Sequence, residues 1–417
     1  MVIKNKKIPN TWDLKRIGDL GEIVTGSTPN TNVDEYWNGD IPFVSPTDMK
    51  GTRYIKNTER TVTYKGAQVG RIIPKNSVMV TCIASIGKLA ISSQECITNQ
   101  QINTIIPYKD YNHEFLYYAI SNQIPYLQTL AGTTAVPIIN KKTFSNVSIP
   151  VPPINEQRKI AAILSSVDEA IEKTETIIEQ TEKVKKGLMQ QLLTKGIGHT
   201  KFKKTEIGEI PEEWEVKSIS EVAKVVSGGT PSKQVSEYWE NGTIPWATPT
   251  DITSNDNKYI STTELMITES GLRNSSANLL PEGSVLMTSR ATIGPRCINT
   301  VPMATNQGFK SFICDPDVLH NEYLYYLIDK IKDQFIALAS GSTFLEISKS
   351  AVETFKIPVP PLEEQIEMAK MLSSLDEKLS VEKVKKESLQ TIKKSLMQSL
   401  LTGKVRVKVD EDEVVSS

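Results

Sequence analysis

The amino-acid sequence contains an internal duplication that spans nearly its whole length. The segment at 25–49 recurs at 227–252, so that Tyr36-Trp37 returns as Tyr238-Trp239, shifted by 202 residues (238 − 36). Further pieces recur in the same order: IIPKNSVMVTCIASIG (72–87) as LLPEGSVLMTSRATIG (279–294), Thr98-Asn99-Gln100 as Thr305-Asn306-Gln307, and IPVPP (149–153) as IPVPP (357–361). A chain with such a repeat is expected to fold into two similar structures.

Each half begins with a segment of mixed character, over 1–152 and again over 197–360. Short β-rich runs such as SVMVTCIA and SVLMTSRA are separated by Gly, Pro and Asn. One helix is predicted at HEFLYYAISNQ and another at NEYLYYLIDKI. This pattern predicts a compact α+β domain in each half.

Each half ends with a long helix, predicted over 153–196 and 361–403. Asn155 is a plausible N-cap for the first helix, and Gly196 and Gly403 are plausible stops. Apolar residues recur at steps of four and three, from Ile160 to Leu192 and from Met368 to Leu400, with polar residues in the middle. Such a seam can pack on its own domain or form a coiled coil, and the length of the helices favours the coiled coil. Because the second helix follows the second domain, the pair must be antiparallel and the chain pseudo-twofold symmetric.

Composition limits the classes of function. The net charge is −1 and the pI is near 6.4, so nucleic-acid affinity must come from local patches. No signal peptide and no membrane-spanning run is recognised, which predicts a cytoplasmic protein. The four cysteines form no CxxC pair and the three histidines are scattered, so no metal site is expected.

The sequence resembles the specificity subunits of type I restriction–modification systems. The resemblance is carried by IPVPPINEQRKIAAILSSVDEAIE (149–172) and IPVPPLEEQIEMAKMLSSLDEKLS (357–380), and by LMQQLLTKG (188–196) and LMQSLLTGKVRV (396–407). It implies two target recognition domains (1–152 and 197–360), two spacer helices (153–196 and 361–403) and a C-terminal tail (404–417). It also implies that each domain reads one half of a split site in double-stranded DNA. The implied partners are two methyltransferase subunits and restriction–translocation subunits.

No motif in the chain predicts catalysis. The amino-methyltransferase motif has Asp or Asn before Pro-Pro, but here Val151 and Val359 stand there, and valine cannot accept the hydrogen bond required. No phosphate-binding G-x-x-x-x-G-K-[ST] loop is found. We therefore expect neither a cofactor nor catalytic residues. A self-sufficient enzyme would need such motifs, and a pure coiled-coil scaffold would leave the duplicated domains unexplained.

Candidate DNA contacts come from the distribution of charge. Residues 50–109 carry nine lysines and arginines against two acids, whereas 253–317 carry five against six. Cations near phosphates and base edges are what DNA binding needs. The candidates are Arg53, Lys56, Lys65, Arg71, Lys88, Lys258, Arg273, Arg290, Arg296 and Lys310.

The two halves can also be compared with each other. The shared pieces TGSTP, Tyr-Trp, PTD and TNQ are expected to build the scaffold, with Asn99-Gln100 and Asn306-Gln307 acting more as caps than as base contacts. Trp37 and Trp239 are expected in the core. The segments 50–71 and 253–278 differ in charge and length, and Arg290 and Arg296 lack a basic counterpart. These differences predict an asymmetric DNA site.

Overall fold

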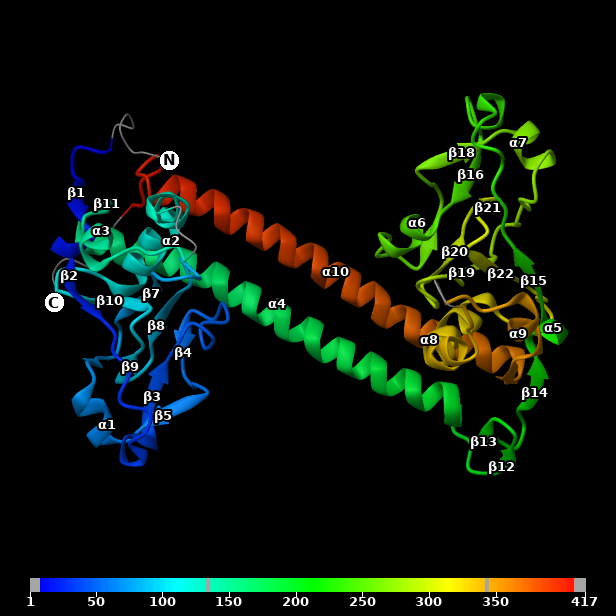
Figure 1. The fold of residues 1–417 in the computed structure, drawn as a ribbon, viewed down its shortest axis with the longest axis horizontal. Coiled ribbons are helices and arrows are strands. Elements are labelled where there is room, and N and C mark those ends of the chain that lie inside the picture. Colours follow the sequence, from blue (N-terminus) through cyan, green and yellow to red (C-terminus); the bar gives the residue numbers. More distant parts are fainter. Residues whose placement is uncertain (1–7, 133–135, 342–344, 409–417) are drawn as a thin grey trace. The chain divides into compact units, whose positions relative to one another are not determined.

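The structure is a computed structural model that describes residues 8–132, 136–341 and 345–408 (Figure 1). The chain divides into two compact units. Unit 1 takes the chain up to Thr176 and again from Lys383, and unit 2 takes Ile177–Glu382. The boundary between the units therefore cuts through both long helices, and each unit holds one mixed domain with one half of each helix.

Unit 1 contains a five-stranded sheet in the order β2-β10-β7-β8-β4 and a four-stranded sheet in the order β5-β3-β9-β6. The pairs β2–β10, β10–β7 and β7–β8 are antiparallel, and β4 runs parallel to β8. The pair β1–β11 leads into the first long helix. The elements are β1 (Asp13–Arg16), β2 (Gly21–Thr25), β3 (Trp37–Val44), β4 (Tyr54–Ile55), β5 (Arg60–Val62), α1 (Tyr64–Val69), β6 (Ile72–Ile73), β7 (Val78–Thr81), β8 (Leu89–Ser92), β9 (Cys96–Thr98), β10 (Ile102–Pro107), α2 (His113–Leu130), α3 (Lys141–Ser145), β11 (Ser148–Val151) and α4 (Ile154–Lys195).

Unit 2 repeats this plan. Its five-stranded sheet has the order β15-β22-β19-β20-β17, its smaller sheet the order β18-β16-β21, and β14 pairs with β23 before the second long helix. A β12–β13 hairpin is added at the start of the unit. The elements are β12 (Phe202–Thr205), β13 (Gly208–Pro211), β14 (Glu215–Ser218), α5 (Ile219–Val222), β15 (Ala223–Ser227), β16 (Ile244–Ala247), α6 (Pro249–Thr253), β17 (Tyr259–Ile260), β18 (Leu265–Ile267), α7 (Glu269–Arg273), β19 (Val285–Thr288), β20 (Arg296–Asn299), β21 (Ala304–Thr305), β22 (Phe309–Cys314), α8 (Asn321–Ala337), α9 (Lys349–Thr354), β23 (Lys356–Val359) and α10 (Leu362–Leu400).

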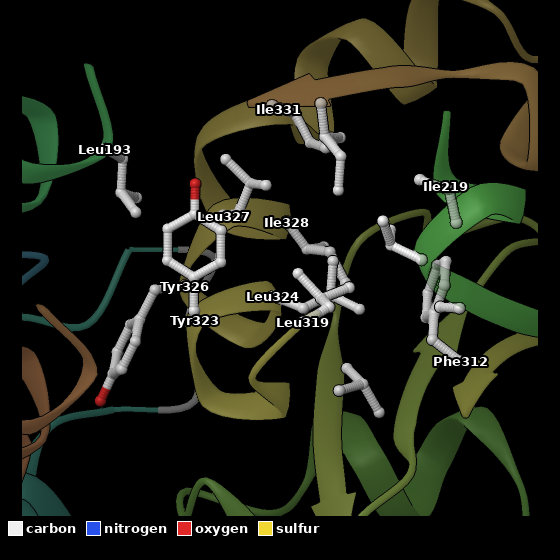
Figure 2. Packing of buried hydrophobic residues seen from close by; sticks show 14 of the residues in the cluster. Leu193, Ile219, Phe312, Leu319, Tyr323, Leu324, Tyr326, Leu327, Ile328 and Ile331 are labelled. Carbon is white, nitrogen blue, oxygen red and sulfur yellow. The ribbon is translucent and has the colours of Figure 1, made fainter. Parts of the chain in front are cut away.

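The main core of each unit lies between the five-stranded sheet and the helix that follows it. In unit 2, α8 packs its apolar face between the sheet and the end of α4. Figure 2 shows Leu324, Leu327 and Ile328 of α8 between Phe312 on one side and Leu193 on the other. In unit 1, α2 packs in the equivalent way against the five-stranded sheet, and Leu400 at the end of α10 joins this core. The predicted α+β fold and both predicted helices are thus confirmed.

The halves of the long helices run antiparallel within each unit. In unit 1, Asp168 of α4 pairs with Lys393 of α10 at 2.6 Å and Glu175 pairs with Lys386 at 2.9 Å. Residue numbers rise along α4 as they fall along α10, which defines the direction. In unit 2, Lys185 pairs with Asp376. The predicted antiparallel helix pair is confirmed.

The apolar ends of the heptad seam also belong to the domain cores. Ile160 and Leu164 join the core of unit 1 together with Leu400. Leu192 joins the core of unit 2 together with Met368 and Leu372. The middle of the seam is polar because there the helices meet each other through ion pairs. Both interpretations of the seam therefore hold, each over a different stretch.

The start of α4 corrects one prediction. The helix begins at Ile154, so Asn155 lies inside it and is not its N-cap. The carbonyl of Pro153 accepts the first helical hydrogen bond, from the Gln157 amide at 3.0 Å. Proline is tolerated just before the first helical residue because the helix needs no hydrogen bond from the N–H that proline lacks. Gly196 has φ +67°, as expected for a residue that ends a helix.

Candidate nucleic-acid interface

The topology of unit 1 brings four loops to one sheet edge. Strands β2 and β7 end there, and β10 and β8 begin there, because each neighbouring pair is antiparallel. Strands β3 and β9 run parallel and end beside them. We call the resulting loops, residues 25–30, 45–48, 82–88 and 99–101, loop cluster 1.

Backbone hydrogen bonds join the loops of loop cluster 1 to one another. The Ser27 amide donates to the Thr98 carbonyl (2.8 Å), the Asn99 amide to the Val44 carbonyl (3.0 Å) and the Cys82 amide to the Gln101 carbonyl (2.7 Å). Gly26 allows this closeness, since a Cβ there would lie 2.1 Å from the Asn99 carbonyl oxygen. The cluster is therefore a firmly connected platform.

Unit 2 builds an equivalent platform, loop cluster 2, from residues 227–232, 248–251, 289–294 and 306–308. The Gly229 amide donates to the Thr305 carbonyl (2.9 Å), the Asn306 amide to the Ala247 carbonyl (3.0 Å) and the Ser289 amide to the Gly308 carbonyl (2.7 Å). Gly228 takes the role of Gly26, with a Cβ placed 1.9 Å from the Asn306 oxygen. The topology that gathers the loops is the same.

The motifs shared by the two halves fill these loops and build them. In the PTD motif, Asp48 accepts from the Ser45 amide and from the Glu59 amide, both at 2.8 Å. Asp251 accepts from the Thr248 and Glu264 amides in the same way. The expectation that shared pieces form the scaffold is confirmed for this motif.

The TNQ motif divides into a cap and an exposed amide. The Asn99 side chain accepts from the Gln101 amide (3.1 Å), and Asn306 accepts from the Gly308 amide (2.8 Å), so both are caps as predicted. Gln100 and Gln307 are exposed, and their Oε1 atoms accept from the hydroxyls of Thr28 and Thr230. Accepting this bond orients each amide at the surface of its cluster.

Three of the cations predicted to bind DNA lie at the loop clusters. Lys88 belongs to cluster 1 and its ammonium donates to the Pro46 carbonyl at 2.8 Å. Arg71 borders cluster 1, where it donates to the Thr25 carbonyl. Arg290 belongs to cluster 2, with 46% of its side chain exposed. The structure thus brings Arg71 and Lys88 together on one platform and Arg290 onto the other.

Three further candidates are exposed but lie away from the clusters. Lys56 follows β4, which runs parallel to β8 and so leads away from the loops. Lys65 lies on α1 and pairs with Glu35. Arg273 lies on α7, is 76% exposed, and pairs with Glu269 at 3.8 Å.

Four candidates are buried against structural partners. Arg53 is 9% exposed and donates to the Tyr118 hydroxyl at 2.9 Å, near Glu114 and Glu169. The side chain of Arg296 is 11% exposed and pairs with Asp329 at 3.2 Å. Lys258 and Lys310 are also mostly buried, at 10% and 6% side-chain exposure. Burial of these four side chains gives them a structural role and argues against direct contact with DNA.

Lys258 forms an ion pair with Glu322 of α8 and a hydrogen bond with Ser373 of α10. Its ammonium lies 2.7 Å from Glu322 and 2.7 Å from the Ser373 hydroxyl. Burial raises the pKa of Glu322, but hydrogen bonds from Lys258, Tyr259 and Ser373 lower it further than burial raises it. The Glu322 carboxylate is therefore kept ionised, and Lys258 neutralises it.

The positive φ of one alanine in each loop cluster was not predicted from the sequence. Ala84 and Ala291 have φ of 60° and 63°, a region that residues with a Cβ rarely adopt. The Ser85 amide donates to the Ile83 carbonyl, and the Thr292 amide to the Arg290 carbonyl, both at 2.8 Å, so each alanine is the centre of a γ-turn. The repeated pieces Ala-Ser-Ile-Gly and Ala-Thr-Ile-Gly were the signal that could have found it.

Within the described ranges, no group of three or more His, Cys, Asp or Glu is placed to hold a metal ion. In the same ranges, no helix has the length and apolar character needed to cross a membrane. Trp37 is 8% exposed and packs edge-on against Phe43, which agrees with its predicted core position. Trp239 is partly buried against Trp246.

Comparison with known proteins identifies the family. The model of the type I restriction modification DNA specificity domain matches residues 9–183 and 211–391. The MjaVIII and MjaIX specificity subunits of type I restriction enzymes from Methanocaldococcus jannaschii are 31% and 30% identical, each over 96% of this chain and 95% of the relative. The type I restriction–modification S subunit from M. genitalium has a similar fold, with a TM-score of 0.61 at 18% identity, over 96% of this chain and 98% of that one. The chain therefore belongs to the family of type I restriction modification DNA specificity proteins.

Proposed function

We propose that this protein is the DNA-specificity subunit of a type I restriction–modification complex. It reads two different half-sites of one split DNA sequence and performs no chemistry itself. The observation that carries the proposal is that the same loop platform is built twice from shared motifs, while the side chains exposed on it differ. Arg71 and Lys88 border cluster 1, and Arg290 belongs to cluster 2.

The proposed roles of the segments follow their order in the sequence. Residues 1–152 and 197–360 are proposed as the two target recognition domains, 153–196 and 361–403 as the spacer helices, and 404–417 as a tail. The DNA contacts are proposed on loop clusters 1 and 2. Of the ten candidate cations, Arg71, Lys88 and Arg290 stay in the proposed set, because they are exposed at the clusters. Phosphate contacts need charge at the surface, and base reading needs oriented donors.

The proposed partners are double-stranded DNA, two methyltransferase subunits and restriction–translocation subunits. Two methyltransferase subunits are expected because each unit presents an equivalent pair of helix halves, one from α4 and one from α10. Relatives are specificity subunits of type I restriction enzymes, which supports this assembly. We further propose that the protein acts in the cytoplasm, where a cell without a nucleus keeps its DNA.

Mapping methylated bases in cells with and without this chain tests the proposal. We expect methylation at one split, non-palindromic sequence that disappears when the chain is absent. The purified chain, with its methyltransferase, should also shift DNA carrying that sequence in a gel. A palindromic site would contradict the asymmetry, and methylation that does not depend on the chain would contradict the proposed function.

A further inference from the structure

Three charged side chains contact one another at the tip of loop cluster 2. Lys310 lies 3.4 Å from Glu346, and Glu346 lies 3.8 Å from Nε of Arg290. The exposed fraction of these side chains rises from 6% for Lys310 to 39% for Glu346 and 46% for Arg290. The three side chains therefore form a row from the buried Lys310 to the Arg290 guanidinium at the surface.

Glu346 and Lys310 give this arginine a defined position. The buried ammonium of Lys310 neutralises the Glu346 carboxylate and also lies 3.5 Å from the Ser289 hydroxyl. A β-bridge joins Arg290 to Glu346 through the backbone. Because Lys310 and the backbone bridge hold Glu346, its carboxylate attracts the guanidinium from a fixed position, at ion-pair rather than hydrogen-bond distance.

The backbone fixes the same tip more firmly. Arg290 directly precedes Ala291, the centre of the γ-turn, and the Ala291 amide donates to the Leu345 carbonyl at 2.9 Å. A non-glycine residue at positive φ costs free energy, and such strain persists where the surroundings over-determine it. Strain of this kind is found at sites that must hold one geometry.

The equivalent tip of cluster 1 has the same backbone and none of the charges. Ala84 has φ 60°, and its amide donates to the Pro137 carbonyl at 3.0 Å. The β-bridge that joins Arg290 to Glu346 corresponds to a bridge between Ile83 and Ile138. Lys310, opposite Met287 on β19, corresponds to Asn103, opposite Val80 on β7. All three contacting positions thus change from charged to neutral together.

We propose that the residue before the strained alanine reads a base in each half-site: Arg290 recognises a guanine in one, and Ile83 with Ile138 contacts a thymine methyl group in the other. This inference rests on the proposed function. Arginine recognises guanine through two parallel hydrogen bonds to O6 and N7, which demands an oriented guanidinium. Aliphatic side chains cannot donate hydrogen bonds but fit the thymine methyl group.

A mere phosphate contact would not need this arrangement. Phosphate binding depends on charge and tolerates many orientations of the cation. A carboxylate that is itself neutralised by a buried lysine serves orientation better than attraction. The geometry therefore favours base reading over phosphate binding.

Methylation mapping of the Arg290→Ala and Arg290→Lys variants, each assembled with the methyltransferase subunits, tests the proposal. Arg290→Ala should lose discrimination at one guanine of one half-site by about 5-fold to 150-fold, and Arg290→Lys should keep only part of it, since lysine can donate to O6 and N7 but lacks the fork geometry. The other half-site should be unchanged. Ile83→Ser should weaken discrimination at one thymine of the opposite half-site only.

The matched control is Lys356→Ala. Lys356 lies on β23, is 41% exposed and pairs with Glu221 at 3.5 Å, much as Arg290 pairs with Glu346. This variant should keep the wild-type site. Thermal unfolding and binding of the methyltransferase check that every variant is folded, and Glu346→Gln provides a milder change that should reduce the same guanine preference.

The outcomes separate two failures. If Arg290→Ala weakens methylation of all sequences equally and Arg290→Lys restores it, Arg290 is a phosphate contact and the inference is wrong. If Arg290→Ala leaves the preference intact, the inference is also wrong, although the proposed function stands as long as the wild-type complex methylates a split site. If the wild-type complex has no split site, the proposed function itself fails.

Discussion

The carboxylate of Asp168 and the ammonium of Lys393 lie 2.6 Å apart and join the two long helices within unit 1. The Tyr118 hydroxyl donates to the same carboxylate at 2.6 Å. Unit 2 repeats the arrangement with Asp376, Lys185 and Tyr326. Each pair thus ties both helices to the helix that follows the main sheet.

Breaking this pair should destabilise unit 1. Asp168→Asn leaves Lys393 and the Tyr118 hydroxyl without their ionised acceptor, and we expect a loss of about 1–2 kcal/mol after discounting for the partly exposed lysine. Urea unfolding of Asp168→Asn, Lys393→Met and the double variant measures the coupling. The control pair is Lys386 and Glu175, measured in the same way with Lys386→Met, Glu175→Gln and their double variant, because Glu175 is 42% exposed. A coupling no larger than that of the control pair would show that the Asp168 pair is only a surface contact.

The salt dependence of DNA binding should separate the cations at cluster 1 from those elsewhere. Arg71→Ala and Lys88→Ala together should lower the slope of log K against log salt by about 1.8, at about 0.9 for each lost phosphate contact. Lys56→Ala with Lys65→Ala removes the same charge away from the cluster and should leave the slope nearly unchanged. Equal slopes for the two double variants would place the phosphate contacts elsewhere.

The γ-turns predict an unusual response to glycine. Ala291→Gly removes the Cβ that disfavours φ of 63°, which should offset the entropic cost of glycine and leave stability unchanged or up to about 1 kcal/mol higher. Ala291→Val should lower stability by at least about 1 kcal/mol, because branching worsens the same strain. Thermal unfolding of the two variants is the measurement, and a destabilised glycine variant would mean that the turn is not strained.

Two half-buried histidines predict a loss of stability in weak acid. Burial lowers the pKa of His113 and of His320 below their ordinary value of 6.5. As the pH falls through 6.5, the unfolded chain binds protons that the folded chain still excludes, so the free energy of unfolding falls until the pH passes the folded-state pKa. His113→Gln with His320→Gln should flatten this decline below pH 6.5. Urea midpoints across the pH range provide the test, and an unchanged slope would assign the decline to other groups.

The sequence predicted the scaffold better than the contacts. The repeat and its periodicity predicted two α+β domains and an antiparallel helix pair, because those features depend on local pattern and on chain order. It also pointed to Lys88 and Arg290. It could not show that Arg53 is buried, because its partners Glu114, Tyr118 and Glu169 come from distant helices and no local pattern records their approach. The strain at Ala84 left only the repeated Ala-Ser-Ile-Gly and Ala-Thr-Ile-Gly pieces as a signal, since hydrogen bonding to a distant segment helps to fix its φ.

The carboxylate of Glu156 joins the first and last described segments of unit 1, which contain Trp12 and Arg406. It is 3% exposed, accepts from Trp12 at 3.0 Å, and pairs with two nitrogens of Arg406 at 2.6 and 2.8 Å. Glu156→Gln should destabilise unit 1 by about 1–3 kcal/mol and leave unit 2 unaffected. Hydrogen exchange resolved by segment would show this difference, and equal loosening of both units would contradict it.

The same arrangement has a consequence for synthesis on the ribosome. Unit 2 is one continuous stretch, so its core is complete once Glu382 has left the ribosome. The core of unit 1 includes Leu400 and Leu401, which are made only after the whole of unit 2. The domain translated first is therefore the second to be finished, and until then its unfilled apolar surface is exposed to chaperones and proteases.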